Sequence, residues 1–397
     1  MKTSSWLAAL VFLALSARVA AALVVGEGFH FPDEAAYVDA AGKLSGGQGF
    51  DPGYNRVPGY PVFLALLSSG LPISVTMLRV GQAAMAALGT VLVFQLADRI
   101  FGRGPAAAAG FTYALDPLLV ISASLFYPEA IAALLMTAAV YAALQGSSRD
   151  SVTRSATAGA ILGILALFRP VALVLPPIVA GWLALTVCAR PTRRMTHLAA
   201  FGLAFLLVLT PWTMRNLRVH GSVLPGMTAG SETAPVRQDE IKRRGFIPSL
   251  IRWAWTNPGD LVWRTTRQFG HFWEFTPTRM ATDDAAQRQE FHRADPRLST
   301  EPIFSRGLRD WVSAVTFALE LGLAIAGILV ALRTRRREVL LLLALILAYA
   351  VGYAIFAAKL RYRIPVLPLV FLFTGVGAAA LYSLMRGGGH VPRSGSV

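Results

Sequence analysis

The sequence predicts an all-α polytopic membrane protein with about ten transmembrane helices and amphipathic interfacial helices in its external loops. Hydrophobic residues make up 55% of the 397 residues, and charged residues only 15%. Apolar runs long enough to cross a bilayer recur along the chain. One soluble core cannot use so many apolar runs, so a soluble globular protein is excluded.

The apolar runs divide the chain into alternating membrane and loop segments. Runs of roughly spanning length occur at residues 6–25, 77–97, 105–122, 128–146, 155–168, 171–189, 198–213, 310–332, 339–357 and 364–384. The predicted organisation is a first transmembrane helix (1–25), an external loop with interfacial helices and catalytic acids (26–76), membrane helices 2–7 (77–213), an external loop with interfacial helices (214–309), membrane helices 8–10 (310–385) and a cytoplasmic tail (386–397).

Basic residues set the predicted orientation. Lysine and arginine gather in the short loops on one side of this arrangement, most densely in the run Arg333–Arg337. The positive-inside rule makes that side cytoplasmic, so both termini lie inside and the two long loops lie outside. The formal charge of +15 is explained by these loops and by anionic membrane lipid, and no aromatic-interleaved basic module indicates a nucleic-acid partner.

The N-terminal segment has two interpretations. Residues 2–22 combine Lys2, an apolar core and the small residues Ala20 to Ala22, which is the pattern of a cleaved signal peptide. An uncleaved anchor is favoured because the apolar run continues to Val25 and approaches spanning length.

The first external loop contains the leading catalytic candidates, Asp33 and Glu34, in the motif FPDEAAYVDAAGKL. Paired acids at the membrane edge usually have a functional reason. The motif predicts a surface helix that starts near Asp33, with Asp39 and Lys43 paired one turn apart. Asp33 could also be the N-cap of that helix. The two roles are compatible, since a helix N-terminus keeps a carboxylate ionised.

Charged residues beside prolines mark further candidate contacts. Arg56 precedes Pro-Gly-Tyr-Pro, which contains Tyr60 and leads into a helix at 62–71 that is too short to span. Glu129 follows Pro128 at a helix start, where it either stabilises the helix dipole or contacts a substrate or metal. Arg169 precedes Pro170 at the outer face and either reaches headgroups or binds an anion.

The outer mouth between the last two predicted spans carries Lys359, Arg361 and Arg363. Three cations within five residues lie on the side opposite the basic loops, so the positive-inside rule does not explain them. A bound phosphate or anionic headgroup is the favoured explanation, and contact of the side chains with the membrane surface is the alternative.

The order of short motifs resembles that of bacterial integral-membrane glycosyltransferases of the GT-C superfamily. The motifs are PDEAAY, RVPGYPVFLAL, YPEA, FRP, PWTMRN, NPGDLVWR and RYRIPVLP, and they extend along nearly the whole chain. The branch most similar to this sequence comprises protein mannosyltransferases and the aminoarabinose transferase of lipid A.

The resemblance implies a reaction and a location. Such enzymes move one sugar, hexosyl or pentosyl, from a polyprenyl-phosphate carrier to an envelope glycan, lipid or protein acceptor. They are multi-pass proteins of the bacterial cytoplasmic (inner) membrane whose active site faces the periplasm or cell exterior. By residue match, Asp33 corresponds to the catalytic aspartate of the family, with Glu34 beside it.

The chemistry gives each candidate a role. Asp33 is expected to act as general base, and Lys359, Arg361 and Arg169 to hold the departing phosphate. The further substrate-binding candidates are Arg56, Tyr60, Glu129 and Arg363. A single base opposite the leaving group predicts inversion. An aspartate at a helix N-terminus is a weak base, so either apolar surroundings raise its pKa or Asp33 mainly orients the acceptor.

The sequence establishes no cofactor and leaves two other functions open. His30, Asp33 and Glu34 offer ligands for a divalent cation, although one histidine and two acids are a weak metal signature. A transporter of lipids or lipid-linked sugars would also need many spans, but it commonly shows repeated halves with helices broken near the midplane. An O-antigen polymerase or ligase is the second alternative, and its acidic pair need not directly follow the first span.

Overall fold

The computed structural model describes residues 3–54, 56–68, 74–187, 190–221, 236, 238–277, 283–334 and 336–386. Beyond Arg386, the predicted cytoplasmic tail lies outside these described residues, as does the end of the predicted short helix at 69–71. Over the described ranges the chain is helical, and no β-strand forms apart from one isolated bridge between Phe29 and Leu298.

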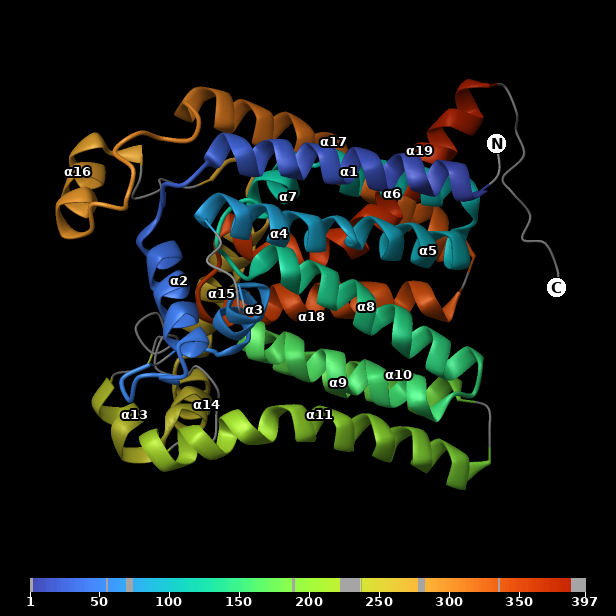
Figure 1. Cartoon of the computed structure of the whole chain (residues 1–397). Helices are drawn as coiled ribbons and strands as arrows, with labels where there is room; N and C mark the ends of the chain where they lie inside the picture. Colours follow the sequence, from blue (N-terminus) through green and yellow to red (C-terminus); the bar gives the residue numbers. More distant parts are fainter. Residues whose placement is uncertain are drawn as a thin grey trace.

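The all-α membrane fold predicted from hydropathy is confirmed. Long helices run side by side in a bundle (Figure 1), and every predicted run coincides with a helical segment. These segments are α1 (Thr3–Val25), α4 (Val75–Ala87) with α5 (Gly89–Phe101), α6 (Arg103–Leu115) with α7 (Pro117–Ser122), α8 (Glu129–Ser148), α9 (Val152–Phe168), η1 (Pro170–Val174) with α10 (Pro176–Thr186), α11 (Pro191–His220), α17 (Arg306–Arg333), α18 (Arg337–Phe356), and η3 (Leu360–Val366) with α19 (Leu367–Met385).

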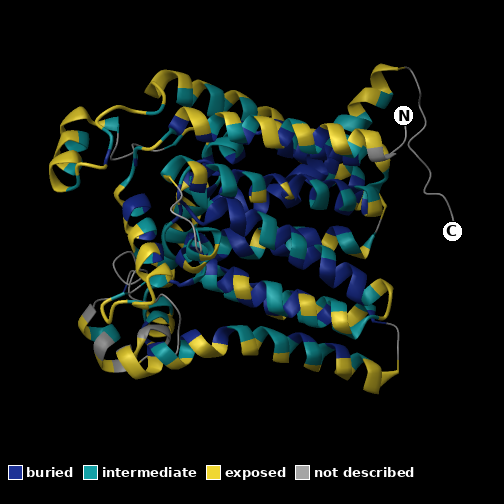
Figure 2. Cartoon of the chain, in the orientation of Figure 1, coloured by how far each residue is buried: buried dark blue, intermediate teal, exposed yellow. Residues whose placement is uncertain are grey.

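Seven of these segments, within the described residues, are long and apolar enough to cross a membrane. In the other three the helices are shorter: α6 and α7 are separate helices of 13 and 6 residues on either side of Asp116, and α9 and η1 with α10 are the other two. Buried side chains concentrate on α8 and α19, whereas α11 is largely exposed (Figure 2). The exposed side chains on α11 include Leu203, Leu206 and Leu207, as expected for a surface that contacts lipid.

Close helix contacts in the bundle depend on glycine. A Cβ atom at Gly327 of α17 would collide with the carbonyl of Phe373, and one at Gly377 of α19 would collide with the carbonyl of Leu323. The two backbones therefore approach through reciprocal glycines. Small residues in such contacts are characteristic of membrane helices, because packing rather than water exclusion holds them together.

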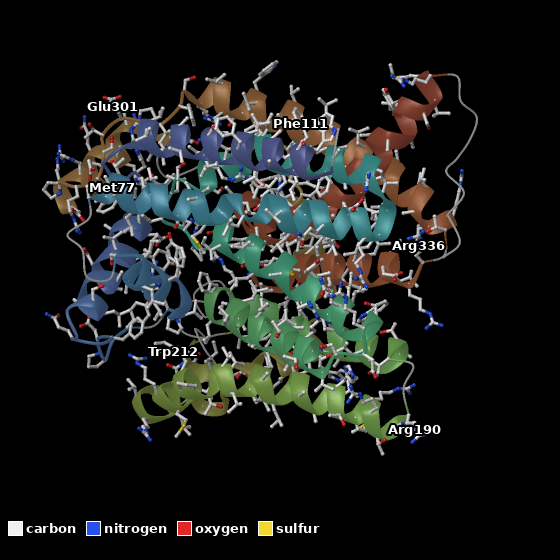
Figure 3. The ribbon with its side chains drawn as sticks, turned by 45° about the vertical axis from the view of Figure 1, so that its right-hand side comes forward. Met77, Phe111, Arg190, Trp212, Glu301 and Arg336 are labelled. Carbon is white, nitrogen blue, oxygen red and sulfur yellow. The ribbon has the colours of Figure 1, made fainter. Side chains whose placement is uncertain are left out.

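Short helices cover one end of the bundle (Figure 1). They are α2 (Pro32–Ser45), α3 (Gly59–Ser68), α13 (Gln238–Arg244), α14 (Phe246–Thr256), α15 (Pro258–Phe272) and α16 (Ala285–Ala294). Met77 and Glu301 lie toward this end, whereas Arg190 and Arg336 lie at the other (Figure 3). The short helices and the basic loops thus occupy opposite ends, as the sequence predicts.

Two local predictions for α2 are wrong. Its N-cap is Phe31, so Asp33 lies in the first turn and is not the cap. Asp39 and Lys43 do not pair with each other, because Lys43 binds Asp51 at 2.6 Å. Asp39 instead accepts two hydrogen bonds from Arg297, at 2.7 and 2.9 Å. A bidentate arginine contact is stronger than a pair one helical turn apart.

Thiol labelling tests the predicted orientation. In a background with the single cysteine changed, Cys188→Ser, we expect Gln289→Cys on α16 to react with a membrane-impermeant reagent in intact cells with a permeabilised outer membrane. Thr334→Cys should react only after lysis, since it lies among the basic loops. The opposite labelling pattern would invert the topology.

Candidate active site

Two carboxylates and three arginines form one contiguous group, which we call the arginine–carboxylate cluster. Asp33 Oδ1 accepts a hydrogen bond from Arg56 Nη2 at 2.8 Å. Arg361 connects the two acids, with Nη2 at 3.5 Å from Asp33 Oδ2 and Nε at 3.5 Å from Glu129 Oε1. Arg169 also forms an ion pair with Glu129. All five residues are candidates predicted from the sequence, and the structure brings them together.

Helix ends position the cluster at the end of the bundle that the short helices cover. Asp33 lies in the first turn of α2, and Glu129 is the first residue of α8. Arg169 separates α9 from η1, and Arg361 belongs to η3. A proline lies within a few residues of each of these positions. Because proline starts or interrupts helices, these side chains project from helix termini rather than from the sides of continuous spans.

The cluster has one more positive than negative charge, and it runs from partly open to buried. The side chains of Asp33 and Arg56 are each 34% exposed, whereas that of Glu129 is 1% exposed. Aromatic rings face the guanidinium groups: Arg361 lies 4.2 Å from the ring centre of Tyr127, and Arg169 lies 5.2 Å from that of Tyr362. Excess cationic charge with planar donors suits an anionic group such as phosphate.

Asp33 is an ionised carboxylate in this arrangement. Its burial alone would raise the pKa, but the charges and hydrogen bonds of Arg56 and Arg361 outweigh burial and hold the pKa below its ordinary value. The first of the two alternatives for Asp33, a pKa raised by apolar surroundings, is therefore wrong. The second alternative, that Asp33 mainly orients the acceptor, stays a prediction. An ionised carboxylate at this position can accept a hydrogen bond from a hydroxyl group.

The lowered pKa predicts a specific pH dependence. A carboxylate with a depressed pKa in the folded state contributes stability above its unfolded pKa of about 4. That stability is lost only as the pH falls through the lower folded value. We expect Arg56→Gln to raise the pKa of Asp33 and so to move the acid limb of activity to higher pH. A pH–activity profile identical to that of the wild type would contradict this assignment.

Glu34 lies outside the cluster. Its Oε2 atom is 2.8 Å from Arg79 Nη1, and both side chains are fully buried. It also accepts hydrogen bonds from the backbone amides of His30, at 2.9 Å, and Phe126, at 3.0 Å. Both carboxylate oxygens are therefore engaged in holding the chain, and the geometry supports a structural role for Glu34 beside the catalytic candidate.

Arg79 is a residue that sequence reasoning missed. It donates to the carbonyls of Gly26 at 3.0 Å, Gly28 at 2.7 Å and Ser124 at 2.5 Å, in addition to Glu34. These bonds fix the segment that leads into Asp33 against the turn before α8. The sequence contains an indication of this role, because Arg79 lies inside an otherwise apolar run at the membrane edge. An arginine in such a position usually has a specific partner.

The remaining candidates occupy different surroundings. The Tyr60 hydroxyl is buried and donates to Gln82 Oε1 at 2.5 Å, and its ring packs edge-on against Tyr37 of α2 at 5.0 Å. Arg363 is buried, donates to the carbonyl of Glu274 and lies over the Phe317 ring. Lys359 is exposed beside Arg361. Only Arg361 of the three neighbouring cations contacts the carboxylates of the cluster.

The described residues contain no group of three or more histidine, cysteine, aspartate or glutamate side chains that could hold a metal ion. His30, Asp33 and Glu34 are adjacent in sequence, but the two carboxylates contact different arginines. Within the described part of the chain, these three residues do not form a common ligand set.

Comparison with known proteins gives one family match and several solved structures with a similar fold. Residues 57–214 match the family described as dolichyl-phosphate-mannose-protein mannosyltransferase. No curated protein sequence gives a significant match. ArnT from Cupriavidus metallidurans in the apo state superposes with a TM-score of 0.61 at 17% identity, covering 98% of this chain and 62% of that chain. ArnT from the same organism, bound to undecaprenyl phosphate, gives a TM-score of 0.59 at 17% identity, covering 97% and 63%.

A second solved enzyme has a similar fold. The apo oligosaccharyltransferase from Archaeoglobus fulgidus gives a TM-score of 0.59 at 13% identity, covering 97% of this chain and 52% of that chain. The chain thus spans less than two thirds of the length of these solved proteins. The resemblance seen in the sequence is confirmed at the level of fold: this chain is a multi-pass membrane protein with the fold of GT-C glycosyltransferases.

Proposed function

We propose that this protein is a glycosyltransferase that moves one sugar from a polyprenyl-phosphate carrier to an acceptor at the external face of the cytoplasmic membrane, with inversion. The observation that carries the proposal is the arginine–carboxylate cluster, in which ionised Asp33 faces Arg56 and Arg361 at the membrane edge. The fold supports it, since ArnT of this fold has been solved with undecaprenyl phosphate. Acceptors of the class are envelope glycans, lipids or proteins.

The reaction needs a base and a site for the leaving phosphate. As the acceptor oxygen bonds to the anomeric carbon, its proton passes to Asp33. The bond between the anomeric carbon and the phosphate oxygen breaks, and its electron pair leaves on the lipid phosphate. Arg361, Arg169 and Arg56 stabilise that charge, because fixed donors act strongly where charge develops. Glu129 orients Arg169 and Arg361 through its two ion pairs.

Donor binding also makes Asp33 a stronger base. In the unliganded cluster, Arg56 and Arg361 hold its pKa down. A phosphate that takes hydrogen bonds from the same arginines offsets their positive charge, so the pKa of Asp33 rises towards its ordinary value. The base is therefore activated only when the donor is in place, which limits unproductive proton uptake.

Replacing Arg361 tests the phosphate role. We expect Arg361→Ala to raise the Michaelis constant for a polyprenyl-phosphate sugar at least about tenfold, because a charge-assisted contact contributes roughly 1.5–3 kcal/mol. If the contact tightens as the phosphate leaves, turnover falls as well. The assay is transfer by purified protein in lipid nanodiscs over a range of donor concentrations.

Two controls sharpen the test. Arg361→Lys keeps the charge but not the planar donor pair, so it should recover part of the loss. Arg267→Ala removes an exposed cation from α15, outside the cluster, and should leave the kinetics unchanged. Wild-type kinetics in Arg56→Ala, Arg169→Ala and Arg361→Ala would exclude the phosphate role. Lipid flipping without any transfer would favour a transporter.

A further inference from the structure

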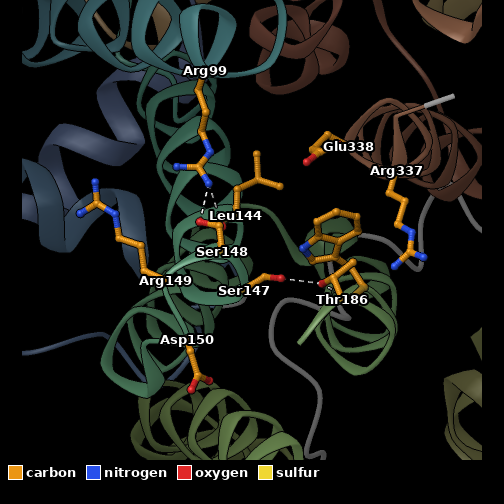
Figure 4. Close-up of a pocket in the computed structure, with 10 residues that line it drawn as sticks. Arg99, Leu144, Ser147, Ser148, Arg149, Asp150, Thr186, Arg337 and Glu338 are labelled. Atoms are coloured by element: carbon orange, nitrogen blue, oxygen red, sulfur yellow. Dashed lines mark hydrogen bonds between the residues drawn. The ribbon is translucent and has the colours of Figure 1, made fainter. Parts of the chain in front are cut away.

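A second polar site lies at the end of the bundle opposite the arginine–carboxylate cluster. There a hollow of about 690 Å³ is lined by side chains from α5, α8, α10 and α18 (Figure 4). Its size falls in the range of small-ligand sites. None of its lining residues belongs to the cluster, so the proposed transfer reaction does not explain it.

Donors line one side of the hollow. Arg99 of α5 extends into it and donates to Ser148 Oγ and, at 3.4 Å, to the carbonyl of Leu144 (Figure 4). Ser147 donates to Thr186 Oγ1 at 2.8 Å, and Thr186 donates to the carbonyl of Trp182 at 2.7 Å, so both of these hydroxyl protons are engaged. The Ser148 hydroxyl accepts from Arg99 and can still donate its own proton. A guanidinium beside such a hydroxyl group is a favourable arrangement for a phosphodiester.

A carboxylate lies on the other side, next in sequence to Arg337. Glu338, in the first turn of α18, extends into the hollow from the side opposite Arg99 (Figure 4). Among the described residues no ion pair involves Glu338, whereas Asp150, the other lining acid, is paired with Arg193 and His197. Arg149 and Arg337 also line the hollow, and Arg337 donates to the carbonyl of Leu185 at 3.4 Å. The hollow therefore combines several guanidinium groups with one carboxylate that forms no ion pair among the described residues, which matches a ligand that carries both a phosphate and a cationic group.

Exposed apolar side chains lie beside the hollow. Leu185, next in sequence to Thr186, and Leu340, two residues after Glu338, are 76% and 61% exposed, as on a surface that contacts acyl chains. Trp182 contributes an apolar ring, and its buried Nε1 donor has no partner in the described chain. A buried donor without an acceptor is costly, and an ester oxygen of a lipid would satisfy it.

We propose that this hollow binds the headgroup of a phospholipid with a primary amine, of the phosphatidylethanolamine class, from the adjacent leaflet. The phosphodiester contacts Arg99 and the Ser148 hydroxyl, the ammonium contacts Glu338, and the ester region lies near Trp182. A phosphatidylcholine headgroup has the same charges but no ammonium hydrogen to donate, and phosphatidylglycerol has no cation. The site therefore distinguishes these three lipids by chemistry.

Native mass spectrometry of the delipidated full-length protein, with added dioleoyl lipids, tests the proposal. We expect phosphatidylethanolamine to be retained in preference to phosphatidylglycerol and phosphatidylcholine. Arg99→Gln should weaken retention of phosphatidylethanolamine roughly tenfold. Glu338→Gln should abolish the preference for the amine while the phosphodiester still binds. Arg103→Gln, which removes an exposed cation at the same end outside the hollow, is the matched control.

Three outcomes would overturn the proposal. The first is equal retention of phosphatidylcholine and phosphatidylethanolamine by the wild type. The second is wild-type retention in both Arg99→Gln and Glu338→Gln. The third is thermal stabilisation by water-soluble glycerophosphoethanolamine equal to that by the lipid, which would identify a free metabolite headgroup rather than a membrane lipid. If Arg99→Gln does not fold, Glu338→Gln alone tests the proposal: loss of the preference for phosphatidylethanolamine supports it, and an unchanged preference contradicts it.

Discussion

Asp33→Asn is expected to lower the rate of sugar transfer on the order of a hundredfold or more, while the protein still inserts and folds. The amide has nearly the same shape as the carboxylate, but it cannot take up the proton from the hydroxyl group of the acceptor. The side chains of Asp33 and its partner Arg56 are each 34% exposed, so the substitution does not leave Arg56 as an isolated buried charge. Single-turnover transfer by purified protein in nanodiscs measures the effect on the chemical step.

Companion variants separate the roles of this carboxylate. Asp39→Asn alters an acid of the same helix that pairs with Arg297 outside the cluster, and it should keep near wild-type transfer. Asp33→Ala should match Asp33→Asn if Asp33 takes up the proton. Much greater residual activity in Asp33→Asn than in Asp33→Ala would indicate that Asp33 orients the acceptor. Near wild-type turnover in Asp33→Asn would reject the catalytic assignment altogether.

Arg79→Met is expected to lower the free energy of unfolding by about 3–5 kcal/mol, because it leaves Glu34 buried without a counter-charge. It also deprives the carbonyls of Gly26, Gly28 and Ser124 of their donor. Denaturant titration in mixed micelles gives the free energy of unfolding.

A double variant tests whether the ion pair causes the loss. Glu34→Gln with Arg79→Met removes both charges, so it should be less destabilised than the sum of the two single variants. Arg267→Met, at an exposed arginine of α15, should change stability by less than about 0.5 kcal/mol. A value for Arg79→Met close to that of the control would refute the structural role.

The fold could be predicted from the sequence, and the five residues of the cluster were among its nine site candidates. The other four, Glu34, Tyr60, Lys359 and Arg363, lie outside the cluster. Hydropathy located every long helix, because the bilayer demands apolar runs of a fixed length. Asp33, Arg56, Glu129, Arg169 and Arg361 could be named because each is a charge at an apolar edge close to a proline. At such positions a charge is costly unless it has a partner or a ligand, so residue type and position alone are informative.

The pairing of these charges could not be predicted. A sequence window presents Asp39 with Lys43 nearby, but the partner that binds is Arg297, 258 residues away. Glu34 looks as suitable for catalysis as Asp33, and only the three-dimensional position of Arg79 shows that it is enclosed. The spacing of charged residues within a short stretch of sequence does not show which contacts form between helix ends that are far apart in the sequence.

The bonds of Arg79 also impose an order on biosynthesis. Its partners Gly26 and Gly28 precede it in the chain, but the Ser124 carbonyl comes only after α5, α6 and α7. The Phe126 amide, which binds Glu34, comes two residues later. A nascent chain that has delivered only α1, α4 and α5 to the membrane therefore has an unfinished outer loop. The segment with Asp33 reaches its final shape only once the turn at 123–126 has been inserted, so the proposed catalytic loop matures after the ribosome has synthesised α6 and α7.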